Sequence, residues 1–301
     1  MSHGIWTIGG GREIGLDCPR VMGILNVTPD SFSDGGELSS PEAAAQAAVR
    51  AQAEGADLLD IGGESTRPGA SRVSVDEQIR RVVPAIEAIR RAGVRLPISV
   101  DTTHSAVVRA AAGACSGDGA SIVNDVSAGE EDAEMFSVVG ELGLGMVLMH
   151  RLCEPARDSY SDAYAVEPAY EDVVADVRRY LAGRVSLARE AGVSERSMLV
   201  DPGLGFGKTV EQNLALVRGT GAFAGLGAGV VSGASRKSFV GRGSLGRDSE
   251  PGERISGSVA LSVCHLGSGA RVFRVHDVGV QASALRLAWR IGVGDGGGGG
   301  P

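Results

Sequence analysis

Residues 58–101 have the sequence LLDIGGESTRPGASRVSVDEQIRRVVPAIEAIRRAGVRLPISVD, and the order of residue types in this stretch predicts the fold class. The apolar runs at 58–61 and 97–100 are short and rich in Leu, Ile and Val, which is typical of buried strands. Each run is followed by polar residues, and a longer segment with helical periodicity separates them. The stretch therefore predicts a strand, a polar loop, a helix and a second strand.

The helical segment between these runs has signals for both of its ends. Ser74 and Glu77 have the spacing of a capping box, and Gly93 follows the segment as a glycine that can end a helix. Pro84 lies inside the pattern and predicts a kink or a shifted start, because proline cannot donate to the preceding carbonyl. The apolar residues share one face, which should pack against strands: Ile79, Val82, Val83, Ile86 and Ile89.

The same alternation recurs along the chain. Ser40 can cap a helix that begins at Pro41 and that Gly55 ends. Further helices are expected at 170–191, 253–266 and 281–290. Eight apolar runs qualify as strands, at 21–25, 58–61, 97–100, 121–124, 145–149, 197–200, 229–233 and 271–275. Alternating strands and helices imply a parallel sheet, and eight such units imply a closed (β/α)8 TIM barrel rather than an open doubly wound sheet.

The chain is expected to form one domain with short additions. Its 301 residues, 43% of them hydrophobic, can bury a large core, and no Pro/Ser linker or charge block divides them. We predict a small N-terminal hairpin extension within residues 1–20, the α/β barrel over 21–293 and a disordered Gly-rich tail over 294–301.

Charge and cysteine content exclude several classes of partner. A net charge of −8 argues against a nucleic-acid or anionic-membrane surface, which would normally carry a clustered basic face. The apolar runs are far shorter than the roughly 18 residues of a membrane-spanning helix. The cysteines lack CxxC spacing and no signal peptide precedes them, which predicts reduced thiols in the cytoplasm: Cys18, Cys115, Cys153 and Cys264.

Polar residues follow nearly every predicted strand. In a (β/α)8 barrel the carboxyl ends of the strands meet at one face, which is the reactive face. Any one of these residues has a structural explanation, such as a helix cap or a satisfied buried histidine, but the whole set predicts a single site. Its members are Asn26, the segment 62–69, Asp101, Asn124, Asp125, His150, Asp201, the segment 235–237, Arg274 and His276.

These residues form two groups by chemistry. Asp101, Asn124 and Asp201 can exchange hydrogen bonds with the edge of a flat, nitrogen-rich heterocycle. A second group is suited to an anion: Asn26, Arg274 and His276 offer donors and positive charge, and Lys237 opens a helix.

Two glycine-rich stretches need separate interpretation. Residues 24–37, ILNVTPDSFSDGGE, contain more polar residues than a turn requires, so they form either a surface loop or part of the site. Residues 201–209, DPGLGFGKT, have three residues between Gly203 and Gly207 where a nucleotide-binding P-loop has four. A nucleoside triphosphate site is therefore rejected.

Seven blocks of this sequence resemble the dihydropteroate synthases, the folate-biosynthesis enzymes that sulfonamides inhibit. In chain order they are ILNVTPDSFSDGG, DIGGESTRPGA, SVDTT, IVNDVSAG, DPGLGFGKT, GASRKSF and FRVHDV, all within residues 21–278. The resemblance implies a pterin-binding TIM barrel. Such a transferase condenses 6-hydroxymethyl-7,8-dihydropterin diphosphate with p-aminobenzoate and forms 7,8-dihydropteroate and diphosphate.

The resemblance also implies roles for individual residues. The catalytic set would be Asn26, Asp101, Asp201, Lys237, Arg274 and His276. The pterin would be held by Asp101, Asn124, Asp201 and Lys237, with Met149 lining its pocket. The diphosphate and a Mg²⁺ ion would meet Asn26, Arg274, His276 and Thr66, and Asp30 and Asp34 would act through the metal or its waters. The p-aminobenzoate would be framed by Phe32, Thr66, Arg67, Pro68, Lys237 and Ser238. A homodimer is usual in this family.

The implied mechanism is dissociative. Diphosphate leaves with the assistance of the metal, the carboxylates of Asp101 and Asp201 stabilise the resulting cation, and the aniline nitrogen attacks it. The segment after His150, RLCEPARDSYSDAY, lacks the Gly-Pro-containing stretch that is common in the family, which leaves its role open.

Two other functions share part of this pattern. A methyltetrahydrofolate-dependent methyltransferase would share the heterocycle-binding acids but would have no use for a diphosphate site. A catalytically altered pterin-binding paralogue should have substitutions among the catalytic set, and none is present.

Overall fold

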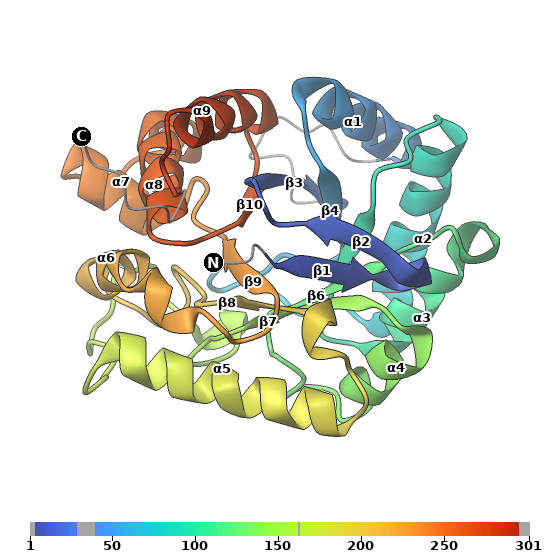
Figure 1. The fold of residues 1–301 in the computed structure, drawn as a ribbon, viewed down its shortest axis with the longest axis horizontal. Coiled ribbons are helices and arrows are strands. Elements are labelled where there is room, and N and C mark those ends of the chain that lie inside the picture. Colours follow the sequence, from blue (N-terminus) through green and yellow to red (C-terminus); the bar gives the residue numbers. More distant parts are fainter. Residues whose placement is uncertain (1–3, 29–39, 162, 295–301) are drawn as a thin grey trace.

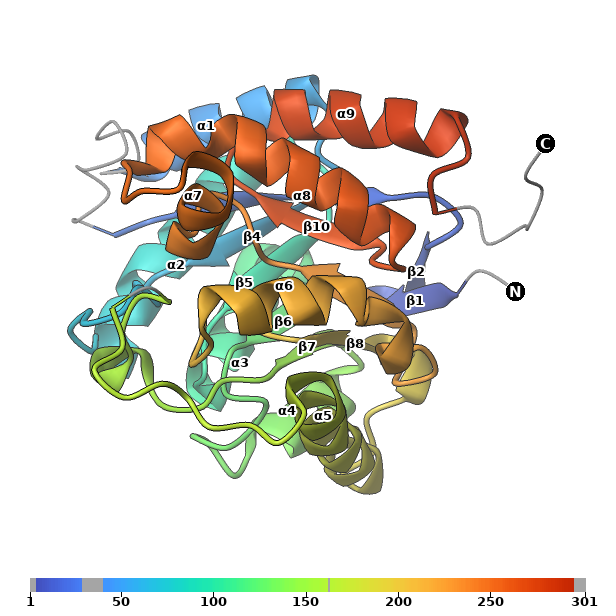
Figure 2. The same ribbon diagram turned by 90° about the vertical axis from the view of Figure 1, so that its left-hand side faces the viewer.

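The computed structural model describes residues 4–28, 40–161 and 163–294, and it contains a closed barrel of eight parallel strands (Figures 1 and 2). The strands follow one another around the barrel in chain order, and β10 pairs with both β9 and β3 to close it. They are β3 (Arg20–Asn26), β4 (Leu58–Gly62), β5 (Ile98–Asp101), β6 (Ile122–Asp125), β7 (Gly145–Met149), β8 (Met198–Asp201), β9 (Gly229–Ser232) and β10 (Val272–Val275). The predicted TIM barrel and its eight strands are confirmed.

Helices cover the outside of this barrel (Figure 1). Those of the described residues are α1 (Pro41–Glu54), α2 (Val75–Arg91), α3 (Ser105–Gly113), α4 (Met135–Leu142), α5 (Val173–Glu190), α6 (Val210–Arg218), α7 (Ser238–Leu245), α8 (Ile255–Gly267) and α9 (Val278–Arg290). Short 3-10 helices add η1 (Gly9–Gly11), η3 (Ala114–Gly117), η4 (Pro155–Arg157), η5 (Glu195–Ser197), η6 (Thr220–Phe223) and η7 (Pro251–Arg254).

The predicted helix ends are partly confirmed. Ser40 caps α1 by accepting from the Ala43 amide at 3.2 Å, and Gly55 ends it in the left-handed region, as expected. The helix expected from 170 begins later, because the Asp172 side chain accepts from two backbone amides of the first turn of α5. The helix expected at 281–290 begins three residues earlier, at Val278.

Helix α2 runs unbroken through Pro84, so the expectation of a shifted start is wrong. Ser74 still caps the helix, and it accepts from the Glu77 amide at 3.3 Å. The Glu77 carboxylate bonds to Arg81 at 2.8 Å instead of completing the capping box. The buried face of the helix packs against the barrel, and this packing offsets the hydrogen bond lost at Pro84. Gly93 follows the end of the helix at a φ of +85°.

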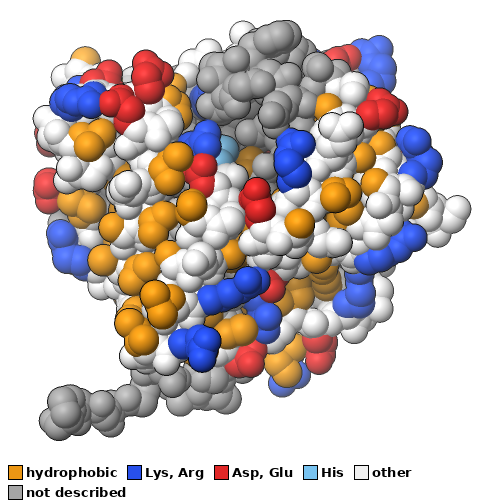
Figure 3. Space-filling model, turned by 90° about the horizontal axis from the view of Figure 1, so that it is seen from above, with side chains coloured by type: hydrophobic (Ala, Val, Ile, Leu, Met, Phe, Trp, Pro, Cys, Tyr) orange, Lys and Arg blue, Asp and Glu red, His pale blue; other side chains and the backbone are white. Residues whose placement is uncertain are grey.

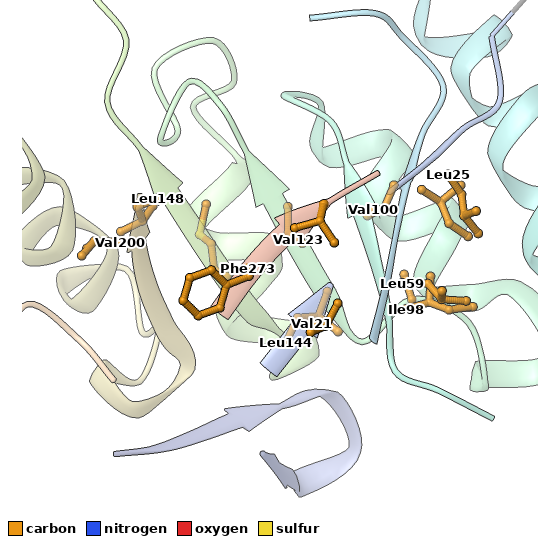
Figure 4. Close-up of a cluster of buried hydrophobic side chains, with 14 of the residues drawn as sticks. Val21, Leu25, Leu59, Ile98, Val100, Val123, Leu144, Leu148, Val200 and Phe273 are labelled. Atoms are coloured by element: carbon orange, nitrogen blue, oxygen red, sulfur yellow. The ribbon is translucent and has the colours of Figure 1, made fainter. Parts of the chain in front are cut away.

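Alternate residues of each strand point to opposite sides of the barrel wall. The outward side chains pack against the helices, and Figure 4 shows several of them, including Val21, Leu59, Val100 and Val123. The inward side chains near the start of the strands form a second apolar cluster, which includes Met22, Leu58, Ile122, Leu199 and Val272. Further along the same strands the inward positions are polar, so the barrel changes from an apolar floor to a polar mouth.

The N-terminal hairpin closes the floor of the barrel. Its strands β1 (Ile5–Ile8) and β2 (Arg12–Gly15) pair antiparallel, which confirms the predicted hairpin. Trp6 is fully buried among the floor side chains, and its indole Nε1 donates to the Ser197 carbonyl at 2.9 Å. At Gly145, the first residue of β7, a Cβ atom would lie 2.9 Å from Ile8 and 3.3 Å from the Trp6 ring, so glycine is required for this fit.

We predict that Trp6→Ala lowers the free energy of unfolding by about 3–5 kcal/mol, because it removes a buried aromatic side chain and leaves a cavity. Urea denaturation measures this change. Catalytic activity of the folded variant should be unchanged, since the hairpin lies at the opposite end of the barrel from the polar mouth. Ile5→Ala, at a residue of the same strand that is 41% exposed, is the control and should change stability far less. Equal destabilisation by the two substitutions would contradict the role of Trp6.

Candidate active site

The polar mouth is organised around the guanidinium group of Arg274, on β10. Its Nε donates to Asp60 Oδ2 at 2.6 Å, and its Nη2 donates to Asp101 Oδ2 at 2.7 Å. Asn124 Nδ2 donates to the same Asp60 oxygen at 3.1 Å. Four strands (β4, β5, β6 and β10) therefore supply one connected network of hydrogen bonds.

The network is buried, and it contains more carboxylates than guanidinium groups. Burial raises the pKa of Asp101 to about 7, with Arg274 lowering it and the neighbouring carboxylates, Asp60 first, raising it further. One guanidinium group thus faces two carboxylates. An electron-poor or cationic ligand at this position would favour the ionised form of Asp101.

Asp201 and Lys237 form a second charged group at the mouth. A Cβ atom on Gly233 would lie 3.1 Å from Asp201 Oδ2 and 4.0 Å from Lys237 Nζ, so both side chains lie near this glycine. Asp201 Oδ1 accepts from the Gly203 amide at 2.7 Å. Burial lowers the pKa of Lys237 to about 8, against the opposing effect of Asp201.

An apolar patch adjoins these charges. Met149 packs with Val126 and Phe206 in a small buried cluster that is separate from the main core. The ammonium group of Lys237 lies 4.2 Å from the centre of the Phe206 ring and donates to the Leu204 carbonyl. A flat ring could therefore contact the patch with its face while its edge meets polar side chains.

His276 contributes a neutral imidazole to this mouth. Burial lowers its pKa to about 3, and the nearby charges of Arg274, Arg236 and Arg67 act in the same direction. Its Nδ1 lies 3.2 Å from the Ser235 hydroxyl. The positive charge expected from Arg274 and His276 together therefore comes from Arg274, and that charge is shared with Asp60 and Asp101.

The residues expected to frame p-aminobenzoate lie on two sides of the mouth. Thr66 lines a cavity together with Asp101, Thr103 and Pro155. Lys237 and Ser238 lie at the start of α7, after β9, which is three strands away from β4 around the barrel. Arg67 is exposed, and Pro68 is partly exposed.

Part of the predicted site falls outside the described residues: Asp30, Phe32 and Asp34. Asn26 is described, and it ends β3 with its amide oxygen 3.4 Å from the Cβ position of Gly62. Within the described ranges, no three His, Cys, Asp or Glu side chains are grouped so that they could hold a metal ion. The amide oxygen of Asn26 suits a hard cation such as Mg²⁺, which commonly takes one or two protein ligands and completes its shell with water and phosphate oxygens.

Sequence reasoning missed the role of Asp60. It lies within the apolar run LLDI, and a single acid inside a buried strand was the signal that could have revealed it. Phe206 and Val126 were also missed, because neither lies at the end of an apolar run.

Lys208 is a further buried cation, and the structure explains why DPGLGFGKT is not a nucleotide loop. Its Nζ donates to the carbonyls of Gly203 at 2.9 Å and Phe206 at 2.8 Å and lies 3.0 Å from His150 Nδ1. Burial lowers the pKa of this lysine to about 7. The ammonium group therefore holds its own loop in shape.

The segment after His150, whose role the sequence left open, links the two sides of the mouth. The Pro155 carbonyl accepts from the Gly69 amide at 2.9 Å, and Asp158 Oδ2 accepts from the Gly207 amide at 2.9 Å. Tyr164 donates to the other Asp158 oxygen at 2.7 Å.

None of the helices in the described part of the chain is both long and apolar enough to cross a membrane. All four cysteines are free thiols in the structure.

Comparisons with known proteins agree with this geometry. The family model described as "Pterin binding enzyme" matches residues 22–276. The dihydropteroate synthase of Escherichia coli K12 is 40% identical over 278 residues, which are 92% of this chain and 93% of that protein. A probable bifunctional folylpolyglutamate synthase/dihydropteroate synthase of Haloferax volcanii is 44% identical over 90% of this chain, which spans 30% of that longer protein.

Solved structures give the same result. The Xanthomonas albilineans dihydropteroate synthase with 4-aminobenzoic acid is 43% identical, with a TM-score of 0.82 and coverage of 95% of this chain and 98% of that chain. The Burkholderia cenocepacia dihydropteroate synthase complexed with 7,8-dihydropteroate is 39% identical, with a TM-score of 0.82 and coverage of 96% of both chains. On sequence, fold and the arrangement of its polar mouth, the chain belongs to the dihydropteroate synthase family of pterin-binding enzymes.

Proposed function

We propose that this chain condenses 6-hydroxymethyl-7,8-dihydropterin diphosphate with p-aminobenzoate and releases 7,8-dihydropteroate and diphosphate. One observation carries the proposal: Asp101, Asn124, Asp201 and Lys237 reach one buried mouth beside the apolar patch of Met149, Val126 and Phe206. Relatives crystallised with 4-aminobenzoic acid and with 7,8-dihydropteroate support the choice of substrates.

The pterin ring would lie with one face on the apolar patch. Its ring nitrogens and exocyclic groups would exchange hydrogen bonds with Asp101, Asn124, Asp201 and Lys237. A ring without these groups would leave buried donors and acceptors unpaired, at a cost of about 1–3 kcal/mol for each one. The mouth therefore selects a ring with a polar edge.

The chemistry needs charge stabilisation and no covalent attachment to the protein. The bond between the pterin methylene carbon and the diphosphate oxygen breaks, and the electron pair leaves with diphosphate. The carboxylates of Asp101 and Asp201 stabilise the positive charge on the pterin. The aniline nitrogen of p-aminobenzoate then forms a bond to the methylene carbon and loses a proton.

A Mg²⁺ ion would be held by the amide oxygen of Asn26, together with oxygens of the diphosphate and water. When bound, such an ion would neutralise charge on the diphosphate. Arg274 and the neutral His276 would add hydrogen-bond donors to the same anion. The second substrate would lie between Thr66, Arg67 and Pro68 on one side and Lys237 and Ser238 on the other.

The four free cysteines agree with a reducing compartment, and we propose that the chain acts in the cytoplasm. Cell fractionation tests this location.

A coupled assay of diphosphate release tests the reaction. We expect release to require both the pterin diphosphate and p-aminobenzoate and to be lost when EDTA removes Mg²⁺. Release that does not increase with p-aminobenzoate would rule out the proposed condensation. Full activity in EDTA would refute the metal requirement alone.

We predict that Asp60→Asn lowers kcat/KM by about tenfold to a hundredfold, because one charge-assisted hydrogen bond in a buried site contributes roughly 1.5–3 kcal/mol. The substitution keeps the shape of the side chain but removes its charge from Arg274. Steady-state kinetics on the folded variant measure the loss. Asp76→Asn, at an exposed residue of α2, is the control. Identical kinetics for the two variants would show that Asp60 does not hold Arg274 for catalysis.

We also propose a homodimer. The side of the molecule on which α1 and α9 lie carries interspersed hydrophobic, acidic and basic side chains (Figure 3). On α9 and just after it, large apolar side chains are exposed at Val280 (50%), Leu287 (63%) and Ile291 (72%). Sedimentation equilibrium should give twice the chain mass of 30.7 kDa. A mass that stays at 30.7 kDa at micromolar concentration would refute the dimer.

A further inference from the structure

Glu131, in the loop after β6, connects loops that follow three other strands. Its carboxylate accepts hydrogen bonds from the guanidinium groups of Arg72 and Arg151 and from the Thr103 hydroxyl, the last at 2.6 Å. Arg72 lies in the loop after β4, Thr103 in the loop after β5 and Arg151 in the loop after β7. One side chain therefore joins four neighbouring loops at the mouth of the barrel.

This cluster is shielded from solvent and depends on the charge of Glu131. The side chains of Glu131 and Arg151 are 12% and 5% exposed. Burial raises the pKa of Glu131, but the hydrogen bonds from Arg72, Thr103 and Arg151 outweigh it and lower the pKa to about 2. If Glu131 lost its charge, Arg151 would be a buried cation without this partner, which is strongly unfavourable.

The cluster is connected to the segment 65–70, which contains Thr66. Glu64, just before this segment, accepts from the Val73 amide at 2.8 Å and from Gln78 Nε2 at 3.0 Å. The middle of the segment is held where Gly69 donates to the Pro155 carbonyl at 2.9 Å. Arg72 holds its far end against Glu131.

The same loops enclose one cavity at the mouth. Its lining includes Thr66 and Ala70 from the segment, Thr103 from the loop after β5, Pro155 from the loop after β7, and Asp101 of the polar network. Arg72 also lines this cavity, so a shift of its side chain would change the shape of the cavity beside Thr66.

We propose that Glu131 is a positioning residue for the second substrate. Through Arg72 it fixes the segment 65–70, and through Arg151 it fixes the loop that holds Gly69. Asp101 and Asn124, which bind the pterin, have supports of their own, because Arg274 donates to Asp101 and to Asp60, and Asn124 donates to Asp60. This inference rests on the proposed function, in which the segment 65–70 frames p-aminobenzoate.

The test separates the Michaelis constants of the two substrates. Glu131→Gln should raise the KM for p-aminobenzoate by about tenfold, in line with the sensitivity of binding geometry to small displacements, and raise the KM for pterin diphosphate far less. Arg72→Ala should act in the same direction, and Arg72→Lys should recover part of the loss because it keeps the charge. Glu141→Gln is the matched control, since it breaks the exposed pair of Arg109 and Glu141, which are 47% and 61% exposed and lie on α3 and α4.

An unchanged KM for p-aminobenzoate, or an equal rise in both KM values, would overturn the role of Glu131. If circular dichroism shows that Glu131→Gln does not fold, Arg72→Ala decides the matter. The Arg72 side chain is 41% exposed, so its substitution should disturb the fold less. The unsubstituted protein is assayed in parallel. Lack of release dependent on p-aminobenzoate in that protein would refute the proposed function, whereas normal activity with unchanged KM values in the variants would refute this inference alone.

Discussion

The buried contact of Arg274 with Asp60 and Asp101 is the constraint on which the mouth of the barrel depends. An isolated guanidinium group inside a protein is very costly, and so is an isolated carboxylate. Each of these groups therefore requires the others. Because the three residues lie on β10, β4 and β5, their hydrogen bonds also fix the positions of these three strands relative to one another. The atoms that hold these strands together also form part of the proposed binding surface.

Polarity changes sharply along the barrel axis. The inward residue of β4 changes from Leu58 to Asp60, and that of β6 changes from Ile122 to Asn124. The apolar floor and the N-terminal hairpin exclude water from below. The network above is consequently held in a medium of low polarity, where its electrostatic effects are strong.

Much of this arrangement could be predicted from the sequence, because strands with a period of two and helices with clear caps are local features. The eight strands, the hairpin and the end of α1 at Gly55 follow from such signals. The contact of Asp60 with Arg274 could not be predicted in the same way, because the two residues lie 214 positions apart in the sequence. Likewise, Glu131 lies in an ordinary polar loop, and its importance depends on Arg72 and Arg151 meeting it in space. The continuity of α2 through Pro84 depends on tertiary packing, which a local rule does not include.

The hairpin beneath the barrel affects the order in which ligands can bind and leave. In the part of the chain that the structure describes, Trp6 seals the floor, and the interior opens at the polar mouth. Whatever binds deepest, against Asp60 and Asn124, must enter before anything that binds nearer the rim beside Thr66. While the ligand near the rim stays bound, it prevents the release of the deeper ligand. A barrel that is closed at its base thus sets the order in which two molecules can enter and leave.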